Sequence, residues 1–358
     1  MAELRAWHMT DAEAWNAFVE AAPYHAFPQL WEWGQVRAMG GWRPLRLAIG
    51  PSHGEPVAGA QLLLRRIPLL GWHLAYVPRG PVGNLDDPDI RDGLLRALRT
   101  LGREERIATV RADPEAEPST PYGEALLADP WRSAPKVQPP ITRVLDLTIG
   151  EEALRADLKR KHRQYVNKAE RAGVTIERFD GSEPPDVIGP ALADFNRIYR
   201  STADRAGFVA RQPFYYERVW SLFAPTGRVR LSFALLEGER VATIYHFTCG
   251  DRAVEAYGGM TDDGADARAN YLLKWDAIAG FARAGFAVYD MWGLATGGIR
   301  QFKEGFGGRE VEYVGARDLA LRAPIDAALR VGIPAYGWAQ RARLRVLGRP
   351  SAEVAENA

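Results

Sequence analysis

The chain is poor in residues that form crosslinks or bind metals. One cysteine, Cys249, is present among 358 residues, so an intramolecular disulfide is excluded and a reducing compartment is expected. Cys249 follows the run TIYHFT without the flanking residues of a cysteine nucleophile, which indicates a partly buried, unreactive thiol. The six histidines are scattered without the spacing of metal ligands. We therefore expect no metal site and no thiol chemistry.

Long apolar runs are missing as well. No stretch approaches the roughly 18 apolar residues that cross a bilayer, and the start, MAELRAWHMTDAEAW, lacks the order of a secretion signal. Apolar residues make up 47% of the chain and charged residues 25%, which is typical of a globular protein. The length suits about two domains. We expect a cytoplasmic protein without a transmembrane segment.

Two parts of the chain repeat one pattern. The segments RPLRLAIGPSHGEPVAGAQLLL from Arg43 and RVRLSFALLEGERVATIYHFT from Arg228 both predict strand, turn, strand, and Gly-Glu-x-Val-Ala recurs from Gly54 at Gly238. A helical pattern and a short strand follow each segment. This order is that of the acetyltransferase-like (GNAT) core. It predicts two tandem GNAT-like domains, an α/β fold with mixed sheets.

The proline-rich stretch 135–140 is expected to connect the two domains. The predicted first domain is 1–144 and the second is 145–315, with the tail 316–358 packing back on the first. Within the tail, residues 323–347 form an arginine-rich helical pattern. Its arginines suit either an anionic surface, such as a membrane or RNA, or a solvated helix face. A peripheral membrane contact is therefore one hypothesis.

The segment 289–308, YDMWGLATGGIRQFKEGFGG, predicts an apolar strand that ends in a glycine-rich loop presenting Phe302 and Lys303. It resembles the signature of the Fem family of peptidoglycan bridge-forming aminoacyltransferases, which includes FemA, FemB and FemX-like proteins. The matching residues are Asp290, Gly293, Phe302, Lys303, Gly305, Phe306 and Gly307. The resemblance extends over nearly the whole chain, and Fem proteins contain two GNAT-like domains.

The resemblance implies a reaction. Fem proteins transfer an amino acid from aminoacyl-tRNA to the stem-peptide amine of a peptidoglycan precursor, and glycine, alanine or serine would be expected here. The precursor, a muramyl peptide, is either nucleotide-linked or lipid-linked. Relatives of the FemA type carry a coiled-coil arm in the second domain, but no sustained heptad lies between Asp194 and Tyr216. The chain therefore resembles the armless FemX type more than the FemA type.

The donor is also suggested by the residues themselves. The stretches DDGADARANYLLKW and GNLDDPDIRDGLL, where coenzyme A would bind in this fold, are acidic and lack the required glycines, so we expect no coenzyme A or other cofactor. The run LKRKHRQYVNKAERAGV from Leu158 instead crowds cations onto one predicted helix. A solvated basic face is the alternative. The candidate tRNA-binding residues are Lys159, Arg160, Lys161 and Arg163.

No Ser-His-Asp or Cys-His set is visible, which predicts direct transfer without an acyl-enzyme. Lys303 is the candidate for stabilising the charge that develops on the carbonyl oxygen. Phe302 either positions the donor's terminal adenosine or aminoacyl group or packs in the core. Asp290 either orients the loop, holds the acceptor amine or caps the strand end.

The resemblance also implies acceptor-binding residues. Arg37 in QLWEWGQVRAMGGW, and Arg211 with Tyr215 in ARQPFYYERVW, match positions that face the muramyl-linked diphosphate, for which forked arginine contacts are suitable. Tyr257 in EAYGGM matches a tyrosine at the floor of the acceptor groove, although a core aromatic is an equal alternative.

Two other functions fit the same residues. One is a Fem-like N-acyltransferase that acts on another amine, such as a polysaccharide amino sugar. The other is a non-catalytic RNA-binding protein whose working surface is the basic helix.

Overall fold

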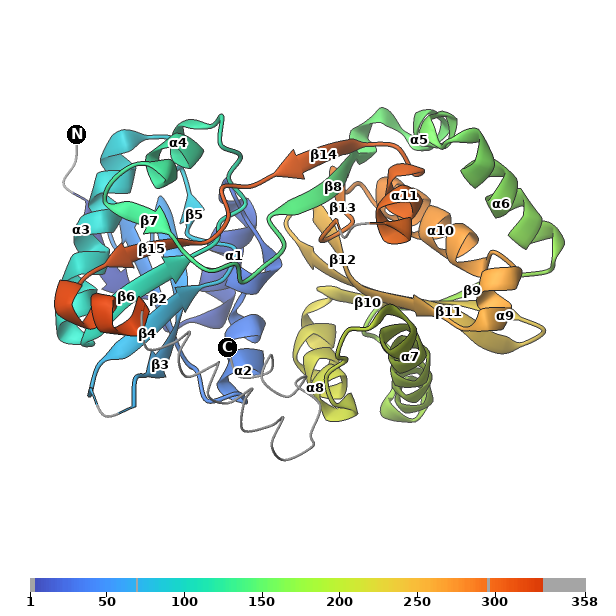
Figure 1. Ribbon diagram of the computed structural model, residues 1–358, viewed down its shortest axis with the longest axis horizontal. Coiled ribbons are helices and arrows are strands. Elements are labelled where there is room, and N and C mark those ends of the chain that lie inside the picture. Colours follow the sequence, from blue (N-terminus) through green and yellow to red (C-terminus); the bar gives the residue numbers. More distant parts are fainter. Residues whose placement is uncertain (1–3, 69, 295–296, 331–358) are drawn as a thin grey trace. The chain divides into compact units, whose positions relative to one another are not determined.

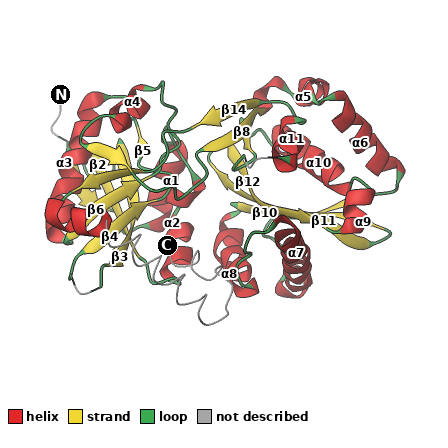
Figure 2. Ribbon diagram, viewed as in Figure 1, coloured by secondary structure: helices red, strands yellow, loops and turns green. Residues whose placement is uncertain are grey.

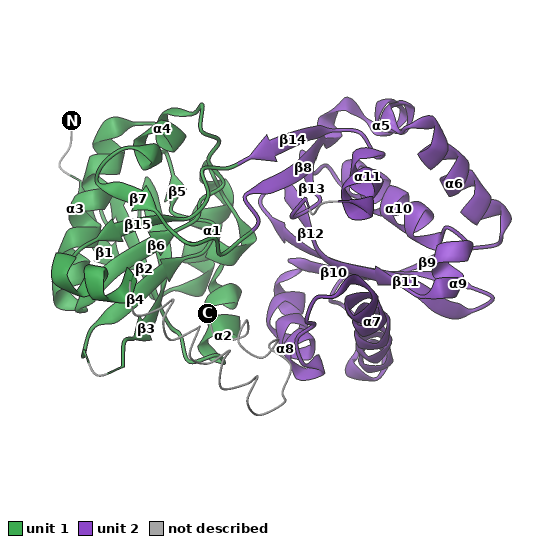
Figure 3. Cartoon of the chain, in the orientation of Figure 1, with its two compact units in different colours: residues 1–138, 313–358 green, residues 139–312 purple. Residues whose placement is uncertain are grey.

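The computed structural model describes residues 4–68, 70–294 and 297–330. The chain divides into two compact units (Figure 3). Unit 1 comprises Met1–Gln138 and Tyr313–Ala358, and unit 2 comprises Pro139–Glu312. The first unit is thus completed by chain that follows the second.

The described part of unit 1 is built on an eight-stranded sheet in the order β1-β2-β3-β4-β6-β15-β7, with β5 paired to β3 (Figure 1). Its strands are β1 (Arg5–His8), β2 (Arg43–Gly50), β3 (Ala58–Arg66), β4 (His73–Val77), β5 (Val82–Gly83), β6 (Ile107–Ala112), β7 (Trp131–Ser133) and β15 (Arg317–Ala320). Its helices are α1 (Ala12–Ala21), α2 (Trp31–Ala38), α3 (Pro88–Glu104) and α4 (Pro121–Leu127), with a 3-10 turn at Phe27–Gln29. Strand β15 lies between β6 and β7, so chain from beyond unit 2 completes this sheet.

The described part of unit 2 has a seven-stranded sheet in the order β14-β8-β13-β12-β11-β10-β9. Its strands are β8 (Ile141–Asp146), β9 (Thr175–Phe179), β10 (Val229–Leu236), β11 (Glu239–Cys249), β12 (Arg252–Met260), β13 (Val288–Asp290) and β14 (Arg309–Glu312). Its helices are α5 (Glu151–Asp157), α6 (Arg160–Arg171), α7 (Pro185–Ala206), α8 (Pro213–Phe223), α9 (Asp262–Asp266), α10 (Ala269–Arg283) and α11 (Gly298–Glu304), with 3-10 turns at Leu147–Ile149 and Ala224–Thr226.

The repeat predicted from the sequence is present in both sheets. The order β2, β3, β4, α3, β6 in unit 1 is matched by β10, β11, β12, α10, β13 in unit 2. One parallel pair occurs in each sheet, β4 with β6 and β12 with β13, while the other pairs among the described strands are antiparallel. The predicted α/β fold with two tandem GNAT-like domains and mixed sheets is therefore confirmed. Between residues 139 and 312, the described chain contains no coiled-coil arm, as predicted.

Strand β11 is buried on both faces because helices cover both sides of the sheet (Figure 2). Tyr245 contacts Phe195 of α7, with ring centroids 5.4 Å apart. The next residue, His246, contacts Phe281 of α10 on the opposite side, at 5.0 Å. This alternation follows from the two-residue period of a strand.

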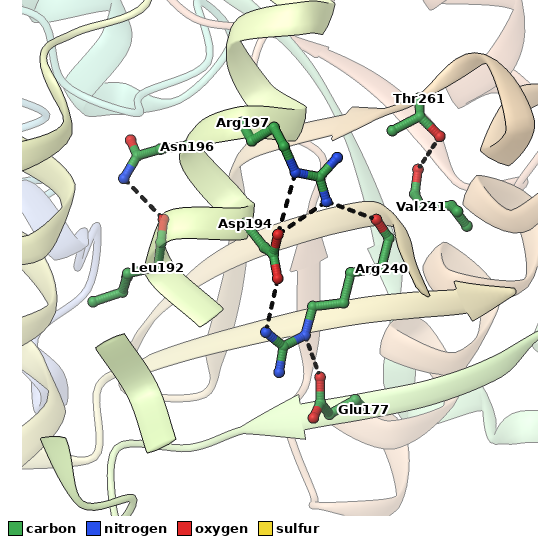
Figure 4. A network of polar contacts seen from close by, with 8 residues as sticks. All are labelled: Glu177, Leu192, Asp194, Asn196, Arg197, Arg240, Val241 and Thr261. Carbon is green, nitrogen blue, oxygen red and sulfur yellow. Dashed lines mark hydrogen bonds and ion pairs between the residues drawn. The ribbon is translucent and has the colours of Figure 1, made fainter. Parts of the chain in front are cut away.

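Arg240 of β11 fastens α7 to the sheet (Figure 4). Its Nε donates to Glu177 of β9 at 2.7 Å, and its Nη1 donates to Asp194 of α7 at 3.0 Å. Asp194 also accepts a hydrogen bond from Arg197, one turn further along the helix, at 2.9 Å. Charge-assisted bonds of this kind fix the direction of the helix as well as its distance from the sheet.

Three details differ from the sequence-based expectations. The boundary expected between residues 144 and 145 falls inside β8, and the units meet between Gln138 and Pro139. The basic run from Leu158 does form one helix, α6, but this helix begins at Arg160, so the candidate residue Lys159 lies just before it. Only residues 323–330 of the arginine-rich tail are described, and they are helical; the remainder lies outside the described residues.

Candidate active site

Unit 2 contains a cavity of about 460 Å³. It opens where two parallel strands separate, because β13 pairs with β12 only as far as Val254 and Asp290, while β12 continues to Met260. Glu255 and Tyr257, on the part of β12 that pairs with β11 but extends beyond β13, line the cavity together with side chains of α10 and α11. The parting of the strands thus creates a concave space that exposes strand backbone and side chains to a ligand.

Phe302 and Lys303 lie on helix α11 and not in the loop that the sequence suggested. Both line the cavity. The Lys303 Nζ donates to the carbonyl oxygens of Met291, Trp292 and Gly293, at 2.6, 2.6 and 2.7 Å. These bonds engage its three N–H donors and hold α11 against the chain that follows β13.

The pKa of Lys303 lies close to neutral pH. Burial lowers the pKa of Lys303 to about 8 from its ordinary 10.5, and the neighbouring charge of Lys274 adds to this, while Glu255 and Asp290 oppose it. At neutral pH the ammonium form still predominates. Lys303 is therefore a cation that loses its charge only in mildly alkaline solution.

A chain of buried polar groups lies beneath the same wall. The Lys274 Nζ is 2.8 Å from Glu255 Oε1, and the Tyr289 hydroxyl donates to Glu255 Oε2 at 2.7 Å. His246 Nε2 lies 2.8 Å from the Tyr289 oxygen. Because the single hydroxyl proton goes to Glu255, the imidazole must donate this last bond from Nε2.

Glu255 is ionised in this environment. Burial raises its pKa, but the charges of Lys274 and Lys303 outweigh that effect and hold the pKa of Glu255 below its ordinary value. Burial also lowers the pKa of His246 to about 3, so its imidazole is neutral at physiological pH. The cavity therefore holds one carboxylate and two lysines at its wall.

Neither Glu255 nor Lys274 was identified from the sequence. The available signal was a charged residue within a mainly apolar run, glutamate in AVEAYGG and lysine, two residues before Asp276, in LLKWDAIAG. Lys274 is 1% exposed, and a lysine on the buried face of a helix needs a partner. The sequence therefore suggests that Lys274 has an acidic partner, but it does not show which acidic residue lies beside it in the fold.

Helix α6 packs directly against the segment that carries Phe302. His162, within the basic run, is buried, and its Nε2 lies 3.0 Å from the Phe302 carbonyl oxygen. The Lys159 backbone N–H donates to the carbonyl of Gly305 at 2.9 Å. A Cβ at Gly305 would lie 1.8 Å from the His162 ring, so glycine is required by this close approach.

The predicted tRNA-binding residues have different environments. Lys159, Arg160 and Lys161 are exposed at the start of α6. Arg163 instead donates to the carbonyls of Ala156 and Leu158, at 2.7 and 2.6 Å, and so holds the corner between α5 and α6. The exposed group is thus smaller than the sequence suggested.

Asp290 does not line the cavity. Its carboxylate is 1% exposed, pairs with Arg252, accepts from the Thr142 hydroxyl and accepts from the Trp292 backbone N–H at 2.8 Å. Burial raises the pKa of Asp290, but the Arg252 charge and the hydrogen bonds from Thr142, Trp292 and Arg252 together outweigh it and keep the pKa below its ordinary value. Of the predicted roles, capping the strand end agrees with this geometry.

The predicted acceptor residues are dispersed. Tyr257 lines the cavity, whereas Arg211 and Tyr215 do not. The Arg211 guanidinium lies 4.8 Å from the ring centroid of Tyr215, at the start of α8. Arg37 belongs to unit 1, on α2, with its guanidinium 5.7 Å from the Trp42 ring.

Other chemistry is limited within the part of the chain that the structure describes. It contains no group of three or more His, Cys, Asp or Glu side chains arranged to hold a metal ion. Cys249 is buried at the end of β11 and is not part of a disulfide. None of the described helices has the length and apolar character that a membrane span needs.

Fold and cavity together define a tandem GNAT-like protein whose second unit carries the open site. A family model described as "Acetyltransferase (GNAT) domain" matches residues 155–304, and one described as "FemAB family" matches residues 10–121. The crystal structure of FemX has a TM-score of 0.81 at 20% identity, covering 91% of this chain and 99% of that one. The chain is thus similar to FemAB proteins in its first unit and to GNAT domains in its second, and it shares the fold of FemX.

The relatives with a named activity match this chain over only part of their own length. Lipid II:glycine glycyltransferase of Staphylococcus saprophyticus subsp. saprophyticus is 28% identical over 246 residues, 65% of this chain and 56% of that protein. Its Staphylococcus aureus counterpart is 26% identical over 240 residues, 64% of this chain and 55% of that protein. The match thus spans slightly more than half the length of these relatives. A tandem GNAT protein from the clavulanic acid biosynthesis pathway shares the fold at a TM-score of 0.52 and 14% identity, covering 89% of this chain and 99% of that one.

Proposed function

We propose that this protein transfers an amino acid from aminoacyl-tRNA to the stem-peptide amine of a muramyl-peptide precursor. The observation that carries the proposal is the cavity of unit 2, in which Phe302 and Lys303 of the Fem signature form one wall. The relatives named lipid II:glycine glycyltransferase support a peptidoglycan precursor as the acceptor and an amino acid as the transferred group.

The reaction needs little covalent participation by the protein. The donor ester is already activated, so the acceptor amine attacks its carbonyl carbon, a C–N bond forms and negative charge develops on the carbonyl oxygen. The intermediate then releases the ribose oxygen, which takes up the proton that the amine loses. The protein's task is to orient the two groups and to stabilise the developing charge.

Lys303 supplies that stabilisation in the proposed mechanism. Its ammonium faces three backbone carbonyls at 2.6 to 2.7 Å, and an oxyanion would replace one of them as the acceptor of a shorter, charge-assisted bond. Phe302, beside it on α11, offers its ring as an apolar surface for the donor's end. Because the pKa of Lys303 is about 8, transfer is expected to decline as the pH rises through that value.

The basic start of α6 is the proposed contact for the tRNA backbone. Lys159, Arg160 and Lys161 are exposed there, and Arg163 fixes the corner from which they project. The bond between His162 and the Phe302 carbonyl links this helix to the cavity wall. Tyr257, Arg211, Tyr215 and Arg37 remain the proposed acceptor contacts.

The test is transfer of labelled amino acid from a charged total tRNA pool to nucleotide-linked and lipid-linked muramyl peptides. Lys303→Met is expected to lose transfer by about 100-fold or more while keeping its fold. Lys136→Met, an exposed lysine in unit 1, is the matched control. Transfer only to an amino sugar, or tRNA binding without transfer to any acceptor, would contradict the proposal.

A further inference from the structure

Lysine is rare in this chain. Six of the 46 lysine and arginine residues are lysines, and two of these, Lys274 and Lys303, line the cavity of unit 2. An arginine stays charged in almost any environment, whereas the charge of a buried lysine responds to its neighbours. The use of lysine at both positions suits a site whose charge is set by its surroundings.

Helix α11 is linked to β13, β12 and α10 by a series of contacts that includes the buried carboxylate of Glu255. Lys303 of α11 binds three carbonyls that follow β13. Tyr289 of β13 donates to Glu255 at 2.7 Å, and Lys274 of α10 donates to the same carboxylate at 2.8 Å. The Lys274 Nζ then lies 4.8 Å from the centroid of the Phe302 ring, back on α11. The contacts form a closed circuit through α11, β13, β12 and α10.

We propose that Lys274 and Glu255 are positioning residues for the transfer reaction, whose ion pair holds Phe302 and Lys303 at the cavity wall and sets the electrostatic field at the Lys303 ammonium. They act through Phe302 and Lys303, and the kinetic part of the inference rests on the function proposed above. The electrostatic part needs no substrate.

The field at Lys303 comes from groups on several elements. Lys274 on α10 disfavours its charge, while Glu255 on β12 and Asp290 at the end of β13 favour it. Asp290 is itself paired with Arg252, and His162 of α6 faces the neighbouring Phe302. Removing one member of the Lys274–Glu255 pair must therefore move the pKa of Lys303 in a direction that depends on which member is lost.

The first experiment measures that pKa directly. The lysine Nζ signals of protein labelled with 15N-lysine are followed between about pH 6 and 11, and the Lys303 signal is assigned by its loss in Lys303→Met. Six lysines give a spectrum simple enough to assign. We expect Lys274→Met to raise the pKa of Lys303 and Glu255→Gln to lower it, each by about one unit. An unchanged pKa in both variants, or shifts of the same sign, would overturn the inference.

The second experiment measures transfer at several pH values. Both variants are expected to lose about 10- to 100-fold in kcat with a smaller change in KM for the acceptor, since misplacement of Phe302 and Lys303 affects the transition state. The upper pH limit of activity should move up in Lys274→Met and down in Glu255→Gln. A purely structural role would lower activity without moving this limit in opposite directions.

A double variant covers the case in which a single change prevents folding. Lys274→Met combined with Glu255→Gln leaves no unpaired buried charge and nearly conserves volume, so it should fold. It is expected to lose kcat although its thermal unfolding is close to that of the wild type. Wild-type rates in the double variant would refute the positioning role. Absence of transfer by the wild-type protein itself would refute the proposed function, and the NMR titration would still decide the electrostatic part.

Discussion

Corresponding strands of the two units lead into a buried aspartate, and its pKa is displaced in opposite directions. Asp113 follows β6 in unit 1 and Asp290 ends β13 in unit 2; they are 2% and 1% exposed. Asp113 accepts hydrogen bonds from the Tyr76 hydroxyl at 2.9 Å and the Arg79 backbone N–H at 2.8 Å. Burial raises the pKa of Asp113 to about 6. At Asp290 the ion pair with Arg252 and the hydrogen bonds from Thr142 and Trp292 together outweigh burial, and the pKa is lowered.

The repeated fold therefore places a buried carboxylate in each unit, and the balance of burial against the neighbouring cation and hydrogen bonds decides whether its pKa is raised or lowered. The Arg79 guanidinium lies 3.5 Å from Glu115, and its charge offsets the burial of Asp113 only in part. The units also differ in open space, because unit 1 contains cavities of about 80 and 110 Å³ where unit 2 contains one of about 460 Å³. Duplication of a backbone has thus produced one unit with a large site lined by charged side chains and another with smaller cavities.

The largest expected effect is that of Asp290→Asn. Removing the carboxylate charge breaks the buried ion pair with Arg252, which should lower the free energy of unfolding by about 3–5 kcal/mol at pH 7. A carboxylate with a lowered pKa stabilises the fold above its unfolded pKa and loses that contribution as the pH falls through its folded pKa. The difference between wild type and variant should therefore shrink in acid. Denaturant unfolding at several pH values checks this, and a cost below about 1 kcal/mol at pH 7 would show that Arg252 does not govern Asp290.

Gly305→Ala tests the part of unit 2 that follows β13, where α6 packs against the end of α11. The new Cβ would lie 1.8 Å from the His162 ring, so the free energy of unfolding should fall by about 1–3 kcal/mol and transfer should be lost. Gly189→Ala is the matched control, since no atom lies within 4 Å of its added Cβ. His162→Ala should relieve the crowding. Equal unfolding of the two glycine variants would contradict the packing of α6 against this segment.

The repeat could be predicted because strand, turn and helix signals recur in the same order, with Gly-Glu-x-Val-Ala at both hairpins. The cavity could not be predicted, because it depends on how far β13 pairs along β12. The glycines of the signature suggested a loop around Phe302. Instead, IRQFKE contains good helix formers, and the helix ends at Gly305, before the positive φ angles of Gly307 and Gly308.

A smaller effect is expected when cations are removed from helix α6 of unit 2, and helix α3 of unit 1 provides the comparison. Arg160→Gln combined with Lys161→Gln on α6 should weaken tRNA binding by about tenfold and reduce the dependence of log affinity on log salt by about 1.5, because two phosphate contacts are lost. The matched control is Arg96→Gln combined with Arg99→Gln, two exposed arginines on α3 of unit 1. Fluorescence anisotropy with labelled tRNA at several salt concentrations measures both. Equal losses in the two variants would mean that net charge, and not the α6 surface, attracts the RNA.

The smallest expected effect is that of Asp113→Asn. An amide can still accept from the Arg79 backbone N–H and stay beside the Tyr76 hydroxyl, so unfolding at pH 5 should change by less than about 1 kcal/mol. A carboxyl group whose pKa rises from 3.8 to about 6 on folding binds more protons in the folded state, so the wild type loses stability as the pH increases across that window. The asparagine variant lacks this loss. It should therefore gain about 1 kcal/mol over the wild type by pH 8, less than the pKa shift alone would give, because the amide gives up a charged acceptor. Urea unfolding at pH 5 and pH 8 measures the difference in stability between variant and wild type. If the variant loses stability relative to the wild type between pH 5 and pH 8, Asp113 is held ionised in the same way as Asp290.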